Sequence, residues 1–222
     1  MNFLAGVQRL HRETGRSNAV PTALVGATTA DQRLFDWYAD AWRAIQSERS
    51  DWRWMRATLD ATLTIDLQTY TGTALGATSF GRWRAQDDRY CPLVYVSGSI
   101  NTAAPVKFLQ LDEFRRRWVY HSGGSSWPIE WSIDEDDQLL LGPPPSVAYK
   151  LRIDYWKEPI ELDADADVPD LPDRFQLMPM WGALIEAAKY DAAPDVLQRA
   201  TDNYATMKEA LLLDQATNRP YL

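Results

Sequence analysis

Polar and apolar residues alternate without a break from Arg56 to Gln68, where the sequence reads RATLDATLTIDLQ. The apolar positions are Ala57, Leu59, Ala61, Leu63, Ile65 and Leu67. Because successive side chains of a strand point to opposite faces, this pattern predicts a half-buried strand of a mostly antiparallel sheet.

Helical patterns lie on both sides of this strand. A helical face is predicted from Phe3 to His11, and Thr29–Gln32 matches a capping box that would open a helix running to about Gln46. After the strand, helices are predicted from Arg174 to about Tyr190 and from Pro194 onward. The last helix has an apolar seam at Leu197, Ala200, Tyr204, Met207 and Leu211.

The region between the helices is predicted to be mainly β-structure. Strands are expected at Leu93–Val96, Arg115–His121 and Trp127–Ile133, whereas Thr69–Gln86 is predicted to be turns and Gln110–Phe114 a brief helical turn. Leu139–Leu141 and Val147–Trp156 are predicted to form a hairpin through Gly142–Pro145, and alternation in the second arm assigns Tyr149, Leu151, Ile153 and Tyr155 to one face.

Together these patterns predict an α+β fold, in which N- and C-terminal helices form a bundle that carries a central antiparallel β insertion, sandwich- or barrel-like. The predicted divisions are residues 1–50 for the N-terminal helices, 51–162 for the β domain, 163–216 for the C-terminal helices and 217–222 for a flexible tail. A chain of 222 residues is long enough to fold without disulfides or metals.

The composition excludes several classes of protein. The net charge of −8 argues against sequence-independent binding to nucleic-acid phosphates, although an acidic wall suits a passage through which DNA slides. No apolar run approaches the ~18 residues of a membrane span, and we expect neither a signal peptide nor membrane association. Cys91 is the one cysteine, so the chain suits a reducing cytosol.

Tryptophan and arginine are unusually frequent. The chain has 10 Trp, and only 5 of its 23 basic residues are Lys. Protein interfaces are enriched in Trp and Arg and depleted in Lys. A GC-rich genome and a well-filled core explain the same bias, and composition does not choose between the two explanations.

The sequence contains little that predicts catalysis. The acidic segment Asp163–Asp170 resembles the opening of a calcium loop, but Val168 and Arg174 occupy the positions that require Gly and Glu, so a solvated linker is favoured. Cys91 and His121 could form a nucleophilic pair only if folding brought them together. We expect no enzyme activity, no cofactor and no metal site.

Two clusters have alternative interpretations. Arg115, Arg116 and Arg117 are a solvated strand edge or a contact for an acidic partner. The rings of Trp127, Trp131 and Trp156 are an aromatic core layer or a platform on which sugars stack.

Several segments in order resemble a known family: a Trp-rich Asp51–Met55, the alternating strand, Leu111–Arg115, the Leu139–Tyr155 hairpin and Leu171–Phe175 at the start of the closing helices. This arrangement is similar to the head-to-tail adaptor (connector) proteins of tailed bacteriophages, the group that includes tail tubular protein A. The resemblance implies a helical bundle with a β insertion, and a structural protein without enzyme activity.

The same resemblance implies a ring, usually a dodecamer, docked beneath the portal protein and above a tail or nozzle protein. DNA would pass through its centre without sequence-specific binding, and the protein would be made in the host cytoplasm and reside in the neck of the virion. A ring subunit presents two different faces to its neighbours. The predicted subunit contacts are Phe35, Trp37, Trp42, Leu197, Tyr204 and Leu211.

For the portal contact we predict Arg115, Arg116 and Arg117 together with Pro220, Tyr221 and Leu222 of a tail that orders on binding. The main competing hypothesis is a carbohydrate-binding or adhesive β module of a virion or cell surface, which predicts exposed, coplanar Trp rings. A hydrolase that uses Cys91 or the Asp163–Asp170 carboxylates is a third.

Overall fold

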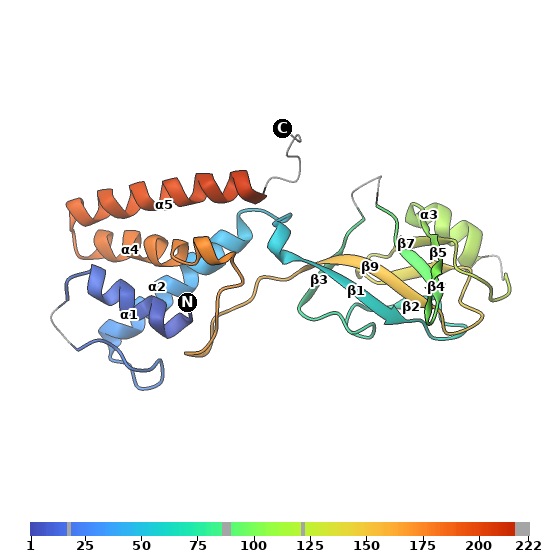
Figure 1. The fold of residues 1–222 in the computed structure, drawn as a ribbon, viewed down its shortest axis with the longest axis horizontal. Coiled ribbons are helices and arrows are strands. Elements are labelled where there is room, and N and C mark those ends of the chain that lie inside the picture. Colours follow the sequence, from blue (N-terminus) through green and yellow to red (C-terminus); the bar gives the residue numbers. More distant parts are fainter. Residues whose placement is uncertain (17–18, 86–89, 121–122, 216–222) are drawn as a thin grey trace. The chain divides into compact units, whose positions relative to one another are not determined.

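The computed structural model describes residues 1–16, 19–85, 90–120 and 123–215, and these form two compact units (Figure 1). The first, called the helical unit below, comprises Met1–Trp54 and Pro159–Leu222, and the second, the β unit, comprises Met55–Glu158. The sequence predicts these divisions at 50/51 and 162/163, near the points where the chain leaves and re-enters the helical unit. The α+β class is confirmed.

The helical unit is built around α4. Its helices are α1 (Phe3–Glu13), α2 (Thr29–Ser47), α4 (Met178–Tyr190) and α5 (Pro194–Gln215). Helix α4 packs against each of the other three. Its Ala183, Ala187 and Ala188 are buried, and such small side chains let neighbouring helices approach closely. A 3₁₀ turn, Asp173–Phe175, precedes α4.

The cap of α2 lies one residue earlier than predicted. The hydroxyl of Thr28, not that of Thr29, accepts a hydrogen bond from the backbone N–H of Asp31 at 3.2 Å. Thr28 also donates to the Asp31 carboxylate at 2.7 Å. The helix thus begins with one half of a capping box, the bond from the N–H of the third residue to the N-cap hydroxyl, and Asp31 stands at that third position in place of Gln.

The β unit contains two sheets, and no closed barrel forms in the described residues. The larger sheet has the order β1 (Arg56–Thr62), β9 (Lys150–Lys157), β4 (Leu93–Val96) and β5 (Ser99–Pro105), and β3 (Phe80–Trp83) also pairs with β9. The smaller sheet has the order β2 (Thr69–Tyr70), β8 (Leu139–Gly142), β7 (Glu130–Ile133) and β6 (Lys107–Phe108).

Side chains from both sheets form one core. Its members include Leu63, Trp83, Val94, Trp131, Leu139, Leu141, Leu151, Ile153 and Tyr155. The predicted inward face of β9 is confirmed, since Leu151, Ile153 and Tyr155 are buried, as is Tyr149 directly before the strand.

The alternating strand is shorter than its pattern. It ends at Thr62, and Ile65 and Leu67 are 52% and 42% exposed instead of buried. Asp66 has a φ of 61°, and its N–H donates to Pro145 O at 2.9 Å. The chain therefore turns here toward the 143–149 loop, and polar–apolar alternation alone carries no signal for that turn.

The predicted hairpin of residues 139–156 is wrong. Leu139–Gly142 pairs in the smaller sheet and Lys150–Lys157 in the larger one, so the Pro-rich segment between them crosses from one sheet to the other. The turn-rich prediction for Thr69–Gln86 also missed β2 and β3, and β5 was not predicted.

The strand predicted at Arg115–His121 is also wrong. The helix α3 (Leu111–Phe114) continues into a π-helical turn, Arg115–Val119. Phe114 is fully buried, and Trp118, four residues later, packs on the same small cluster with Leu109 and Leu140. Phe114 and Trp118 are four residues apart, which is a helical spacing. Their shared packing therefore agrees with a helical structure of this segment, whereas the three arginines between them do not determine it.

Candidate interaction surfaces

A surface groove runs across α4 between α2 and α5. It has a volume of ≈ 550 Å³ and is lined by Trp37, Asp40, Ala41, Ala44, Gly182, Ile185, Glu186 and Tyr204. Gly182 forms part of its floor, since a Cβ there would lie 3.0 Å from the Cβ of Ala41 and 3.3 Å from Tyr204. The absence of a side chain at this position keeps the groove open.

The groove has an apolar centre and an acidic rim. Trp37 and Tyr204 are half-buried, and Trp37 lies against Tyr190 with 5.6 Å between ring centroids. At the rim, Asp40 pairs with Arg43 at 3.1 Å and Glu186 with Lys189 at 2.6 Å. Burial raises the pKa of the Tyr204 hydroxyl further above neutral pH.

The structure divides the six predicted subunit contacts into two groups. Phe35, Trp42 and Leu211 are at most 1% exposed and belong to the core of the helical unit, which leaves them no surface for a neighbouring subunit. Trp37 and Tyr204 lie together in the groove, and Leu197 is half-buried. For these three, subunit contact stays a prediction. The wide apolar stripe of α2 is explained by burial against α1, α4 and the 159–163 segment.

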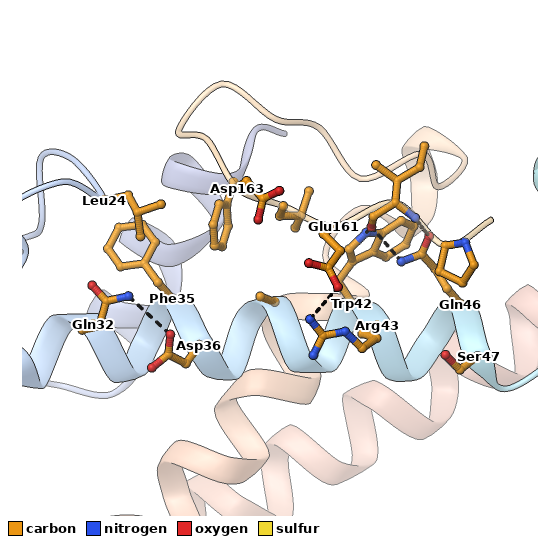
Figure 2. Close-up of a pocket in the computed structure, with 15 residues that line it drawn as sticks. Leu24, Gln32, Phe35, Asp36, Trp42, Arg43, Gln46, Ser47, Glu161 and Asp163 are labelled. Atoms are coloured by element: carbon orange, nitrogen blue, oxygen red, sulfur yellow. Dashed lines mark hydrogen bonds and ion pairs between the residues drawn. The ribbon is translucent and has the colours of Figure 1, made fainter. Parts of the chain in front are cut away.

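A second pocket, of ≈ 400 Å³, lies along α2 beneath residues 159–163 (Figure 2). Phe35 and Trp42 line its base, and Asp36, Arg43 and Glu161 lie at its edge. The indole N–H of Trp42 donates to Ile160 O at 2.7 Å. Gln46 bonds to both backbone groups of the same residue: its Nε2 donates to Ile160 O at 3.0 Å, and its Oε1 accepts from Ile160 N at 2.8 Å.

The acidic segment that resembled a calcium loop is an ordered part of the helical unit. The carboxylate of Asp167 accepts from the N–H groups of Asp163 and Ala164, both at 2.8 Å, and Asp165 Oδ1 accepts from Leu24 N at 2.8 Å. The carbonyl of Asp167 also accepts from Phe3 N at 2.7 Å, which ties this segment to the start of α1. Within the described residues, no group of three or more His, Cys, Asp or Glu could hold a metal ion.

Two of the three predicted portal-contact arginines pair with carboxylates of the β unit, and the third donates to a backbone carbonyl. Arg115 binds Glu135 through both of its terminal nitrogens, at 2.8 and 2.6 Å, and this hydrogen-bonded pairing lowers the pKa of Glu135. Arg117 pairs with Glu113 at 3.2 Å and with Glu130. Arg116 donates to the carbonyl of Asp112 at 3.4 Å. A role at the portal stays a prediction for all three.

The three tryptophans considered as a sugar platform do not share an exposed surface. Trp131 is 1% exposed and packs edge-on against Phe108, 5.1 Å away. Trp127 is half-buried against Tyr149, at 4.6 Å, and Trp156 is half-buried on the other sheet. The core-layer interpretation therefore fits Trp131, and nothing in this arrangement favours stacking on sugar rings.

Of the remaining predicted residues, only Cys91 is described by the structure. Cys91 is exposed, while His121 and the tail residues Pro220, Tyr221 and Leu222 lie outside the described residues. Sequence reasoning missed the groove itself, because its members come from three helices, and α2 lies more than a hundred residues before α4 and α5 in the chain. A signal was present in Gly182, a glycine inside an otherwise helical pattern.

No helix in the described part of the chain is long and apolar enough to cross a membrane. A family model described as SU10 adaptor protein matches residues 1–221. A search of the curated proteins found no match.

Proposed function

Because the chain belongs to the SU10 adaptor protein family, whose members are structural adaptors of bacteriophage virions, we propose that it is the head-to-tail adaptor of a tailed phage. It assembles into a ring beneath the portal, most simply a dodecamer that follows the portal's symmetry, and binds a tail or nozzle protein below. DNA passes through the ring, and the protein is synthesised in the host cytoplasm before it joins the neck. The observation that carries the proposal is the family match over nearly the whole chain.

Three properties of the chain support a role as a ring subunit. The groove on the helical unit offers a half-buried aromatic pair, Trp37 and Tyr204, and aromatic residues are typical anchors of protein interfaces. The β unit exposes large apolar side chains, Ile65, Leu67 and Ile129 among them. The net charge of −8 disfavours adhesion of the DNA phosphates to the walls of a passage.

We propose further that the protein has no catalytic activity of its own. Its chemistry is then entirely that of assembly: apolar burial at subunit contacts, with salt bridges and backbone hydrogen bonds that set the register. This proposal predicts that Cys91→Ser leaves assembly and infectivity unchanged, and a loss of function in that variant would contradict it.

The test is native mass spectrometry of the purified full chain mixed with the portal of the phage that encodes it. We expect a complex that contains one portal ring and about twelve copies of this chain. A mixture in which portal and chain remain separate at micromolar concentration would contradict the proposal.

A further inference from the structure

The outward face of the larger sheet carries an excess of positive charge. On β9, Leu151, Ile153 and Tyr155 point into the core, so the residues between them point away from it. Residues opposite one another on neighbouring strands share a face, and the register extends this outward face to β1 and β3. We call its positively charged residues the basic row: Arg56, Arg82, Arg84, Lys150 and Arg152.

The strands supply only two carboxylates to the same face. Asp154 accepts from Arg84 at 3.0 Å, and Asp60 accepts from Arg152 at 2.9 Å. Five cations therefore meet two carboxylates on the outward side of these strands, although the chain as a whole has a net charge of −8. This face differs in sign from the rest of the protein.

Arg56 and Lys150 lie at the two ends of the basic row. Arg56 is opposite Trp156, and Lys150 is opposite Thr62, six residues further along β1, which corresponds to about 20 Å. Arg56 comes no closer than 3.9 Å to a carboxylate of the described chain, and Lys150 forms no ion pair within it. Both ends of the row can therefore bind a carboxylate of a partner.

Helix α5 carries a row of negative charge of similar length. Asp195, Asp202 and Glu209, called the acidic row below, are exposed and follow one another at intervals of seven residues. They lie along one side of the helix, with a drift of about 20° per interval. At about 1.5 Å per residue, the acidic row is about 21 Å long.

This side of α5 is open to a partner. The main packing partner of α5 within the described residues is α4. The two cations of α5, Arg199 and Lys208, pair with Glu13 at 2.9 Å and Glu48 at 2.7 Å, and these pairs direct them toward other helices of the unit. Leu213, which is 64% exposed, adds an apolar residue near the C-terminal end of the acidic row.

The two rows identify each other as partners. They have opposite charge and nearly equal length, and a helix that lies along the strands of a sheet contacts them over that whole length. Arginine side chains suit such a contact because their planar guanidinium groups match the geometry of carboxylates. A contact between the sheet of one copy and the helix of another is heterologous, which is the kind that closes into a ring.

We propose that α5 of one subunit lies along the outward face of the larger sheet of the next, so that the acidic row faces the basic row. This inference rests on the proposed function, because it assigns a contact through which the ring forms. The occupant of the sheet face is a second copy of this chain. Complementary charges fix which surfaces meet and in which register, and salt weakens their attraction.

Charge reversal tests the contact. The sheet variant combines Arg56→Glu with Lys150→Glu, and the helix variant combines Asp202→Lys with Glu209→Lys. Either variant alone brings like charges together at every contact, so we expect the concentration needed for half-assembly at low salt to rise about tenfold or more. Mass photometry of the full chain measures it, with the portal present if the wild type requires the portal to assemble.

Mixing the two variants gives the decisive result. In a ring in which they alternate, each reversed sheet meets a reversed helix and each original sheet meets an original helix, so opposite charges are restored at every contact. We expect an equal mixture to assemble within about threefold of the wild-type concentration. No other acidic partner of the sheet face would produce this rescue.

Controls separate the contact from general effects of charge. Lys107→Glu and Asp36→Lys reverse exposed charges of the same two units away from both rows, and each should assemble like the wild type. Urea unfolding checks that each monomer is folded. If a reversal unfolds the chain, the neutral substitutions Lys150→Gln and Glu209→Gln replace it, and each should weaken assembly about threefold.

The outcomes separate this inference from the function on which it rests. Folded sheet and helix variants that each assemble alone at the wild-type concentration would overturn the helix–sheet contact, and so would two defective variants that mixing does not rescue. Either result would leave the adaptor function standing. A wild-type chain that forms no ring, alone or with its portal, would contradict both.

Discussion

Gln46 holds the chain where it returns from the β unit to the helical unit. Gln46 is 3% exposed, and both polar atoms of its side chain bond to the backbone of Ile160, at 3.0 and 2.8 Å (Figure 2). We predict that Gln46→Ala destabilises the helical unit and releases the 159–163 segment.

The expected magnitude follows from the bonds lost. Two hydrogen bonds contribute about 1 kcal/mol each, and the N–H of Ile160 is left without an acceptor, which adds up to about 1 kcal/mol. The carbonyl of Ile160 keeps its bond from Trp42. Alanine is the better helix former, which offsets a few tenths of a kcal/mol. The free energy of unfolding should therefore fall by about 2 kcal/mol.

Gln32→Ala is the matched control, because it makes the same substitution on the same helix. Gln32 is exposed and donates only to Asp36 at 3.3 Å, so its loss should change the free energy of unfolding by less than about 0.5 kcal/mol. Urea unfolding measures both variants, and hydrogen exchange should show faster exchange at residues 159–163 in Gln46→Ala alone. Equal effects of the two substitutions would refute the reasoning.

Four further predictions concern the two units and the tail. Glu130→Gln should destabilise the β unit by about 1–3 kcal/mol in urea, because Glu130 is buried and accepts from Trp118 Nε1 at 2.7 Å and from Arg117. Glu135→Gln, on the exposed surface, should cost less stability, and equal costs of the two substitutions would contradict this. Trp37→Ala should weaken ring assembly and leave the monomer folded, and mass photometry showing wild-type assembly would exclude the groove as a subunit contact. Deletion of residues 217–222 should leave the urea midpoint unchanged and abolish portal binding in a pull-down; unchanged binding would exclude the tail as the docking segment. Desolvation raises the pKa of Asp60, but hydrogen bonds from Tyr95 and Arg152 outweigh it, so the pKa is lowered on folding. The stability that Asp60 contributes is therefore present above the unfolded pKa of about 3.9 and is lost as the pH falls through the folded value. Below pH 4 the wild type should lose more stability than Asp60→Asn, and parallel losses would count against the hydrogen bonds of Asp60 with Tyr95 and Arg152.

The sequence predicted the helices well because each depends on local periodicity. Phe3, Val7 and Leu10 recur at helical spacing and are all buried on α1, and Pro194 begins α5. Even here the predicted cap of α2 is one residue late, because two threonines stand side by side and the structure uses Thr28, which bonds to Asp31.

The β unit was less predictable because its pairing is not local. Residues 139–157 look like a hairpin, but whether their two strands share a sheet depends on β1 and β4, which come from far earlier in the chain. Exposed Ile65 and Leu67 continue a perfect alternation beyond the end of their strand, so the pattern had no means to mark the turn at Asp66.

The candidate surfaces divide in the same way. Aromatic residues on one helix could be identified as a wide apolar stripe, but burial separates Phe35 and Trp42, which pack inside the unit, from Trp37, which faces the groove. Which of these aromatic residues are buried and which face the groove depends on how α4 and α5 pack, and the sequence of α2 alone does not show it.

Cryo-electron microscopy of the chain bound to its portal tests most directly whether this protein acts by assembling with copies of itself. We expect a closed ring beneath the portal in which Trp37 is buried between neighbouring subunits and the ring encloses an open central passage. Single copies attached to the portal without mutual contact, or a ring with its centre sealed by the chain itself, would contradict the account.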